Sequence, residues 1–339
     1  MSKSQNTNLN KAKEGKKDEF YTQLSDIEKE LKHYKHHFKD KVVYCNCDDP
    51  RVSNFFHYFS FNFDKLGLRK LITTCYKSQD SDLFSQNDSE RAIYLEYIGD
   101  KNGNRVPDPN EIGIHYLEGD GDFRSRESIE LLKQADIVVT NPPFSLFREY
   151  VAQLIEYNKS FLIIGSQNSI SYKEIFKLFQ TNKIWFGYNS VKTFTIPETY
   201  IHNSIKIENG IKYAIFGNIS WYTNLDITKR HEDIILYKSY KGNEVEYPKY
   251  VNYDAIEVGK VKEIPVDYQG EMGVPITFLD KYNPDQFEII GSSINLGKPM
   301  SEIATKGSYV AGGPRFYLDN GNGSFTRLYD RIVIRNKRL

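Results

Sequence analysis

Short apolar segments alternate with amphipathic ones along much of this 339-residue chain. Segments rich in β-branched residues, typical of buried strands, are 41–46, 69–77, 136–141, 161–165 and 212–217. Segments with apolar residues at helical spacing are 127–135, 146–158 and 171–182. Because helices placed between strands provide the crossovers that parallel strands need, the order predicts an α/β fold with a doubly wound, mainly parallel sheet.

Other segments extend or interrupt this alternation. Residues 1–17 are polar and rich in Lys, and predict a disordered tail. An amphipathic helix is expected next, from the spacing of Leu24, Ile27, Leu31, Tyr34 and Phe38. Within residues 92–120, Asn102-Gly103 separates two alternating apolar runs, which predicts an antiparallel hairpin.

From residue 231 the pattern changes to short strands with little helix, at 233–240, 287–293 and 331–336. We therefore expect two parts, residues 18–230 and a smaller lobe at 231–339. Four cations end the chain, Arg331, Arg335, Lys337 and Arg338, and either neutralise phosphates or form a solvated terminus.

Composition limits the function without selecting it. Lys and Arg together number 45, as do Asp and Glu, so there is no global basic field, although nucleic-acid binders can confine their cations to one face. The sparse, odd set of cysteines, Cys45, Cys47 and Cys75, is typical of a reducing compartment, so we expect a cytoplasmic protein. No signal-peptide pattern is visible and no apolar run reaches the roughly 18 residues of a membrane span, so no membrane role is expected.

Three histidines have helical spacing in the first helix, His33, His36 and His37. Lysines flank them, and no Cys or carboxylate partner stands out. We therefore expect a solvated face and no metal.

The segment that carries chemistry is DIVVTNPPFS, residues 136–145. Pro142 and Pro143 each fix their own φ and restrict the preceding residue, which makes the loop stiff. Asn and Pro are also common in ordinary turns. This loop, however, directly follows an apolar strand and precedes a helix, and in open α/β sheets ligands bind at the carboxyl ends of strands.

The proline loop can hold a planar amine. The side-chain oxygen of Asn141 and the carbonyl of Pro142 are two acceptors without competing proline N–H groups, which matches the two protons of an exocyclic amine. Holding both protons frees the nitrogen lone pair for attack. Phe144 supplies a face on which a base removed from a duplex can stack.

With these residues the sequence resembles the amino-methyltransferases of DNA, whose motif is Asp/Asn/Ser-Pro-Pro-aromatic. More closely, DEFYTQ, VVYCNCDDP, EGDGDF, ADIVVTNPPFSLFREY and MGVPITFLDKYNP are similar to the EcoRI-type adenine-specific modification methylases, from about residue 18 to the C-terminus. The resemblance implies a Rossmann-like, S-adenosylmethionine-dependent domain over 18–230 and a target-recognition lobe over 231–339. The catalytic residues it implies are Asn141, Pro142, Pro143 and Phe144.

The resemblance also implies cofactor-binding residues. They are Phe20, Tyr21 and Thr22 before the first strand, Cys45, Asn46, Asp48 and Asp49 after it, and Asp120 or Asp122 for the adenine ring of S-adenosylmethionine. The usual Phe-x-Gly-x-Gly is replaced by CNCDDP, and LITTCYKS offers no acid for the ribose.

A second aromatic wall for the base is expected from Phe186, Trp221 or Tyr222, with core packing as the alternative for each. The implied function is N6-methylation of adenine in double-stranded DNA, with a cognate restriction endonuclease as a possible partner. Two alternatives stay open. One is methylation of another planar amine, such as cytosine N4, an RNA adenine or a protein glutamine, and the other is an inactive nucleic-acid-binding module.

Overall fold

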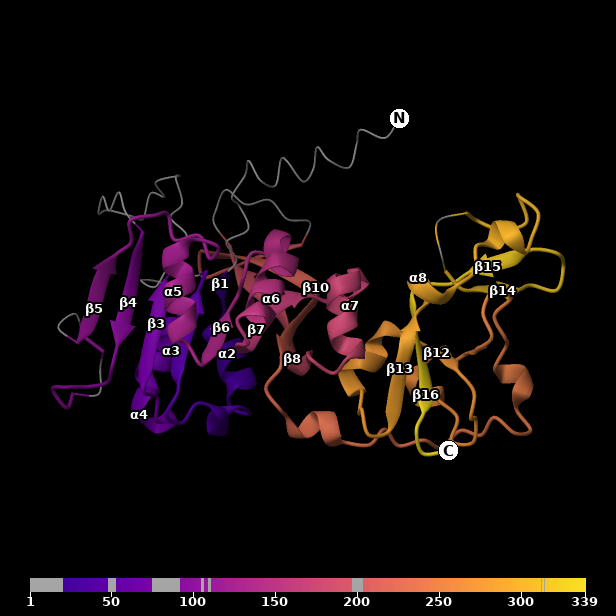
Figure 1. Cartoon of the computed structure of the whole chain (residues 1–339), viewed down its shortest axis with the longest axis horizontal. Coiled ribbons are helices and arrows are strands. Elements are labelled where there is room, and N and C mark those ends of the chain that lie inside the picture. The colour runs from indigo at the N-terminus through magenta and orange to yellow at the C-terminus, as the bar shows by residue number, and fades with distance from the viewer. Residues whose placement is uncertain are drawn as a thin grey trace. The chain divides into compact units, whose positions relative to one another are not determined.

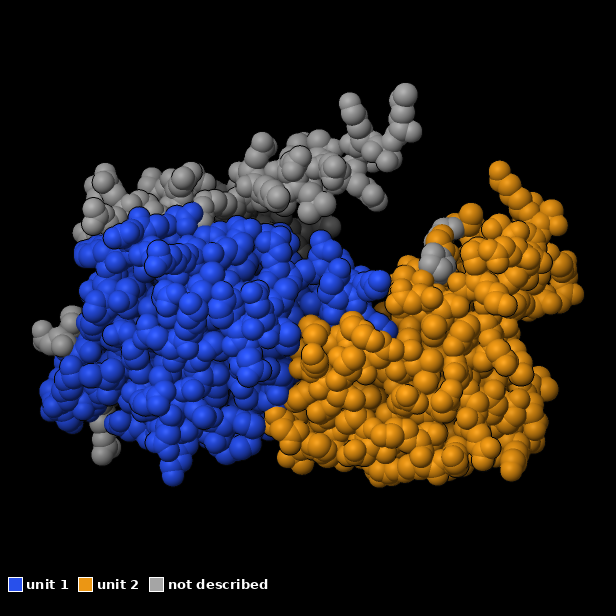
Figure 2. Space-filling view, viewed as in Figure 1, with its two compact units in different colours: residues 1–176, 186–225 blue, residues 177–185, 226–339 orange. Residues whose placement is uncertain are grey.

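The computed structural model describes residues 21–47, 53–74, 92–104, 107–108, 111–196, 204–311, 313 and 315–339. The expected disordered tail, 1–17, lies outside the described residues. The chain divides into two compact units, residues 1–176 with 186–225 and residues 177–185 with 226–339 (Figure 2). The second unit therefore takes in residues 177–185 as well as the C-terminal part of the chain from Asp226. The Gln180 side chain, for example, donates a hydrogen bond of 2.7 Å to the Ile290 carbonyl of that unit.

One large sheet forms the centre of the first unit, in the order β1-β8-β10-β7-β6-β2-β3-β4-β5, with β9 paired to β10 (Figure 1). Its strands are β1 (Tyr21–Thr22), β2 (Val42–Asn46), β3 (Lys70–Thr74), β4 (Ile93–Tyr97), β5 (Ile112–Tyr116), β6 (Ile137–Thr140), β7 (Ser160–Ser166), β8 (Trp185–Thr195), β9 (Ile205–Glu208) and β10 (Ile211–Thr223).

The centre of this sheet is parallel and its flanks are antiparallel. β2 pairs in parallel with β3 and β6, and β6 pairs in parallel with β7. β4 and β5 continue one side antiparallel, and β10 joins the other side antiparallel to β7. The α/β class is confirmed, but the expectation of a mainly parallel sheet is corrected to a mixed sheet, because hairpins extend the parallel centre on both sides.

Helices cover both faces of the central sheet, with α5 and α6 on the near face and α2 and α3 behind it in Figure 1. The helices of this unit are α2 (Leu24–Leu31), α3 (Asn54–Phe61), α4 (Phe63–Leu66), α5 (Arg126–Gln134), α6 (Phe147–Glu156) and α7 (Lys173–Gln180), the last of which runs on into the second unit. The three helices expected after residue 126 are confirmed. The N-terminal helix ends at Leu31 instead of reaching Phe38, and a short 3-10 turn, η1 (Lys35–His37), follows it.

A buried carboxylate fixes α2 to β8. Glu30 accepts hydrogen bonds of 2.8 Å from the backbone N–H groups of Tyr188 and Asn189 and from the Tyr34 hydroxyl. A side chain at Gly187 would place its Cβ 2.2 Å from this carboxylate, so only glycine fits there. Burial and the negative charge of Glu30 raise the pKa of Tyr34.

The predicted hairpin is confirmed as β4 and β5, which pair antiparallel from Ile93↔Tyr116 to Tyr97↔Ile112. In the connecting loop, the buried Glu111 accepts hydrogen bonds from the backbone N–H groups of Lys101 and Asn102, at 2.7 and 3.1 Å. Gly103 adopts φ 79°, the left-handed conformation for which the Asn-Gly pair is suited.

The second unit has its own sheet, in the order β11-β12-β16-β13, and a separate pair, β14-β15. Its elements are β11 (Ile256–Glu257), β12 (Met272–Pro275), β13 (Phe287–Ser292), α8 (Ser293–Leu296), β14 (Tyr317–Asp319), β15 (Phe325–Arg327) and β16 (Arg331–Asn336). The prediction of a strand at 233–240 is wrong, because that segment makes only one isolated β-bridge, Lys238↔Pro265. A core of Tyr250, Ala255, Phe316 and Val333 supports the sheet.

The cations at the end of the chain bind groups of their own unit. Arg331 donates to Glu257 at 2.7 Å with both side chains largely buried, and Arg338 donates to Asp233 at 2.6 Å. Arg335 binds Glu271 at 2.7 Å, and Lys337 donates to the Pro284 carbonyl at 2.8 Å. These contacts favour a structural role over phosphate binding. Within the described ranges, no helix is long and apolar enough to cross a membrane.

Candidate active site

The carboxyl ends of β2 and β6 meet at the point where the chain changes direction across the sheet. From β2 the chain continues to β3 on one side, and from β6 to β7 on the other. Such a switch point is where open α/β sheets bind ligands. The Thr140 hydroxyl donates a hydrogen bond to the Asn46 carbonyl, which ties the two strand ends together.

The Asn-Pro-Pro-Phe loop begins at this switch point. Asn141, immediately after β6, is buried, with 6% of its surface exposed, and Pro142 is buried beside it. Pro143 has φ −56° and ψ 123°, and its carbonyl accepts a hydrogen bond of 3.0 Å from Leu146 N. The chain then enters the 3-10 turn η2 (Phe144–Leu146) and α6. Backbone and packing together fix Asn141 at the strand end, as expected from the two prolines.

The ring of Phe144 contacts two aromatic residues that the sequence analysis did not select. Phe194 on β8 and Phe216 on β10 lie edge-on to Phe144, with centroid distances of 6.3 and 6.5 Å. Their own rings are 5.5 Å apart. These contacts join strands remote in sequence, so only the alternation of aromatic residues in 185–195 and 211–223 could have pointed to them.

The three residues expected to form the second aromatic wall lie in the core. Trp221 and Tyr222 are fully buried and Phe186 is nearly so. The Tyr222 hydroxyl donates to the Ser166 carbonyl at 2.7 Å, and its ring packs 4.9 Å from that of Phe186 and 5.0 Å from that of Phe147. Their burial favours core packing, the alternative considered for each of them.

Helix α6 connects the Asn-Pro-Pro-Phe loop to β2 and β7. The Tyr150 hydroxyl donates a hydrogen bond to the side-chain oxygen of Asn46, and burial raises the pKa of Tyr150 well above its usual range. Phe147 packs directly on Gly165 of β7, where an added Cβ would lie 2.4 Å from the Phe147 ring. Asn46, expected to bind the cofactor, therefore uses its amide oxygen to hold the helix that follows the Asn-Pro-Pro-Phe loop.

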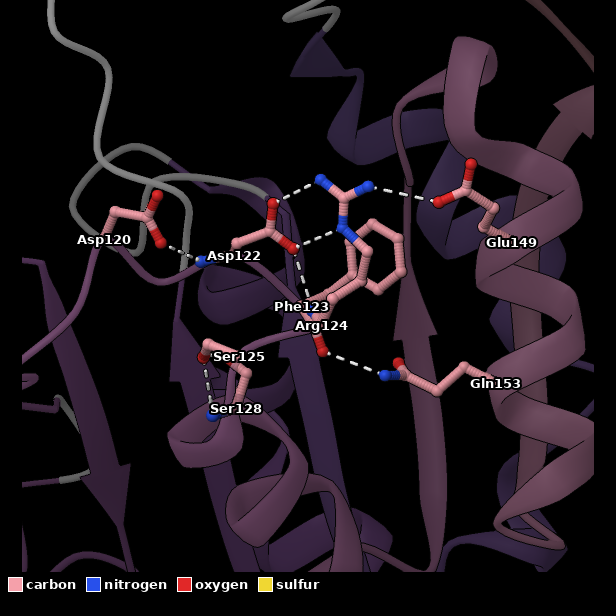
Figure 3. Close-up of polar contacts among 8 residues, drawn as sticks. All are labelled: Asp120, Asp122, Phe123, Arg124, Ser125, Ser128, Glu149 and Gln153. Atoms are coloured by element: carbon pink, nitrogen blue, oxygen red, sulfur yellow. Dashed lines mark hydrogen bonds and ion pairs between the residues drawn. The ribbon is translucent and has the colours of Figure 1, made fainter.

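The Gly-Asp-Gly-Asp-Phe loop rests against the same helix (Figure 3). Arg124 binds the Asp122 carboxylate through two nitrogens, at 2.9 and 2.7 Å, and reaches Glu149 on α6 at 3.1 Å. The side chain of Gln153 donates to the Phe123 carbonyl at 3.0 Å. The pKa of Arg124 is raised, chiefly by its hydrogen bonds to Asp122.

The two expected adenine-reading carboxylates thus differ in their surroundings. Both oxygens of Asp122 accept hydrogen bonds from Arg124. Asp120 is exposed, and one of its oxygens accepts a hydrogen bond of 3.1 Å from Asp122 N (Figure 3). Asp122 consequently shapes the loop, whereas Asp120 is the more accessible acceptor.

The expected cofactor residues before and after β2 are described only in part. Phe20, Asp48 and Asp49 lie outside the described residues. Tyr21 and Thr22 form β1, in which Thr22 pairs with Phe194, the neighbour of Phe144. Cys45 is buried at the end of β2, and Cys47 follows it with φ 92°. The cysteine thus occupies a glycine-like conformation in the loop where the familiar glycine pattern is missing.

The histidines of the N-terminal segment pack against aromatic rings. His33 stacks on Tyr188 with a centroid distance of 3.9 Å, and the rings of His36 and His37 are 4.0 Å apart. Burial lowers the pKa of His33. No group of residues suited to a metal ion occurs in the part of the chain that the structure describes.

A buried Asn-Pro-Pro-Phe loop at the switch point of an α/β sheet is typical of methyltransferases that modify planar amines. Comparison of the whole sequence narrows this class. Residues 8–337 match the family described as adenine-specific methyltransferase EcoRI, and the chain belongs to that family. The predictions of a methyltransferase, of adenine specificity and of the EcoRI-type family are thereby confirmed.

Curated relatives match over nearly their whole length. Type II methyltransferase M.EcoRI of Escherichia coli is 50% identical, covering 98% of this chain and 97% of that protein. M.MgeORF184P of Mycoplasma genitalium is 40% identical, covering 98% and 99%, and M.MpnI of Mycoplasma pneumoniae is 39% identical, covering 97% and 98%. No solved structure matches the chain.

Proposed function

We propose that this adenine-specific methyltransferase transfers a methyl group from S-adenosylmethionine to N6 of an adenine that has been flipped out of duplex DNA. The observation that carries the proposal is the buried Asn141 in a proline-fixed loop at the switch point, in a chain that belongs to an adenine-specific family. A base inside a duplex cannot reach a buried amide, so the adenine must leave the stack.

Asn141 and Pro142 hold the reacting amine. The Asn141 side-chain oxygen and the Pro142 carbonyl accept its two N–H protons, which draws the nitrogen towards tetrahedral geometry and frees its lone pair. Phe144 stacks on the adenine, supported at its edges by Phe194 and Phe216. S-adenosylmethionine supplies an electrophilic sulfonium methyl. Catalysis by the chain is therefore positioning and exclusion of water.

The described residues suit that cofactor. Thr22 on β1 has a buried hydroxyl that lacks a hydrogen-bond partner among the described residues, so it is suited to a polar group of a ligand. Asp120 offers a carboxylate to the amino group of the cofactor's adenine ring. Arg124 and α6 keep that loop in place relative to the catalytic loop.

The second unit is proposed as the target-recognition lobe. It has its own sheet and core, as a base-reading module needs to hold its loops rigidly. A role in restriction–modification, with a cognate endonuclease acting on the same site, follows from the type II names of the relatives.

The test is transfer of labelled methyl from S-adenosylmethionine to unmethylated duplex DNA, with nucleoside analysis of the product. Asn141→Ala, assayed in parallel, separates catalysis by this site from contamination. We expect label in N6-methyladenine with the wild type alone. Label in N4-methylcytosine, in RNA or in protein, or no transfer at all, would overturn the proposal.

A further inference from the structure

The hairpin of β9 and β10 extends beyond the catalytic edge of the sheet. Ser166, the last residue of β7, pairs with Ile219 in the middle of β10. Residues 211–218 therefore run past the end of β7, on the edge where the parallel strands β2 and β6 also end. We call residues 205–218, which extend beyond the end of β7, the arm. A strand rises roughly 3.3 Å per residue, so the turn of the arm lies well beyond the catalytic loop near its base.

A tight turn defines the end of the arm. Asn209 and Gly210 both have positive φ, 51° and 78°, as the two central residues of a type I′ turn require. The strands next to the turn pair Ile207 with Lys212 and Ile205 with Ala214. The positions of the side chains on each face are thus fixed by the register.

One face of the arm leads to the catalytic loop. Directly paired residues share a face and residues alternate along a strand, so Ile205, Ile207 and Ala214 lie on the same face as Phe216. The Phe216 ring contacts Phe144 of the catalytic loop. Ile207, nearest the turn on this face, is 70% exposed.

We propose that the β9–β10 hairpin inserts Ile207 into the DNA duplex, in the space that the flipped adenine leaves. The inference rests on the proposed function. An exposed isoleucine at the end of a stiff arm is suited to wedge between base pairs, as apolar side chains of other DNA-deforming proteins do. Continuity of this face with Phe144 selects duplex DNA as the occupant, because the extracted base lies against Phe144. Lys212 is the strand partner of Ile207, and its positive charge is of the kind that DNA phosphates attract.

Ile207→Ala is the test, and Ile211→Ala is the matched control. Ile211 is next to the same turn, is 46% exposed and lies on the opposite face. The target site is first mapped by sequencing DNA methylated by the wild type. Each protein is then mixed with duplexes carrying 2-aminopurine at the target adenine, whose fluorescence rises on unstacking. Methylation is measured on the paired duplex and on one with a mismatch at the target.

We expect Ile207→Ala to lose most of the fluorescence rise and to lower kcat/KM on the paired duplex by about tenfold or more, with near-normal kcat/KM on the mismatched duplex. Ile211→Ala should stay within about twofold of the wild type on both. Equal effects of the two variants, or an equal loss by Ile207→Ala on both duplexes, would overturn the wedge.

Two other outcomes would also contradict the insertion of Ile207 into the duplex. If Ile207→Ala dissociates a dimer of the free protein, the tip is an interface between copies. If the wild type methylates no DNA, the proposed function fails and the wedge role of Ile207 fails with it. If the wild type methylates DNA and Ile207→Ala behaves like the wild type, only the wedge role is contradicted.

Discussion

The hydroxyl of Tyr150 on α6 donates a hydrogen bond to the side-chain oxygen of Asn46 at the end of β2. Both residues are buried. The bond connects the strand end expected beside the cofactor to the helix that follows the Asn-Pro-Pro-Phe loop.

Removing this hydroxyl should destabilise the first unit. Tyr150→Phe leaves the Asn46 oxygen buried without its donor, which should lower the free energy of unfolding by about 1–3 kcal/mol. Urea denaturation measures the loss. Tyr116→Phe, at an exposed tyrosine, should change stability by less than about 0.5 kcal/mol. Equal midpoints for the two variants would contradict a structural role for the bond.

The backbone at Cys47 should tolerate glycine but not a β-branched residue. At φ 92° a valine is strained, so Cys47→Val should lose about 1–3 kcal/mol of stability. Cys47→Gly should retain the fold, since glycine adopts this conformation readily. Thermal unfolding compares them, and a valine variant as stable as the glycine variant would contradict the assigned conformation.

Asp120 and Asp122 should give different defects. Asp120→Asn should raise KM for S-adenosylmethionine with little change in unfolding temperature, because Asp120 is exposed. Asp122→Asn removes the charge that Arg124 binds and should cost about 1 kcal/mol of stability, a partly exposed pair being weak. Arg124→Lys should lose a similar amount of stability, since a lysine ammonium cannot bind both Asp122 oxygens through two parallel N–H groups as the guanidinium does. A KM defect confined to Asp122→Asn would reverse the assignment.

Stability of the second unit should depend on Asp267 at low pH. Hydrogen bonds from the Ser239 hydroxyl and the Tyr240 N–H lower the pKa of Asp267 from 3.8 to about 2. Ionised Asp267 therefore stabilises the fold above pH 3.8, and this stabilisation is lost as the pH falls towards 2. The difference in unfolding free energy between wild type and Asp267→Asn should be constant near neutral pH and shrink in that window. A difference independent of pH would exclude this linkage.

What the sequence predicts well is local. Pro142 and Pro143 restrict their own backbone and that of Asn141, so the loop's stiffness and its place after a strand follow from adjacent residues. The β4–β5 hairpin is predicted from the two alternating apolar runs around Asn102-Gly103, although the connection is a longer loop, residues 98–111, in which only Gly103 of that pair has a positive φ.

What the sequence misses depends on remote pairing. The contact of Phe144 with Phe194 and Phe216 needs β8 and β10 to reach the catalytic edge, and aromatic residues at 186, 221 and 222 look equally suitable until burial separates them. Helix α3 was missed because its apolar residues occupy several faces, including Phe55, Phe56 and Phe59, which hides the helical period.

Single-turnover methyl transfer by Asn141→Ala on a duplex with a mapped target site tests the proposed role of Asn141 most directly. Because we propose that Asn141 holds the amine that reacts, the rate should fall by about 100-fold or more. Dissociation constants for S-adenosylmethionine and DNA, measured on the same preparation, should stay within about threefold of the wild type. A near-normal rate of transfer by Asn141→Ala would contradict the assignment of this loop as the catalytic centre.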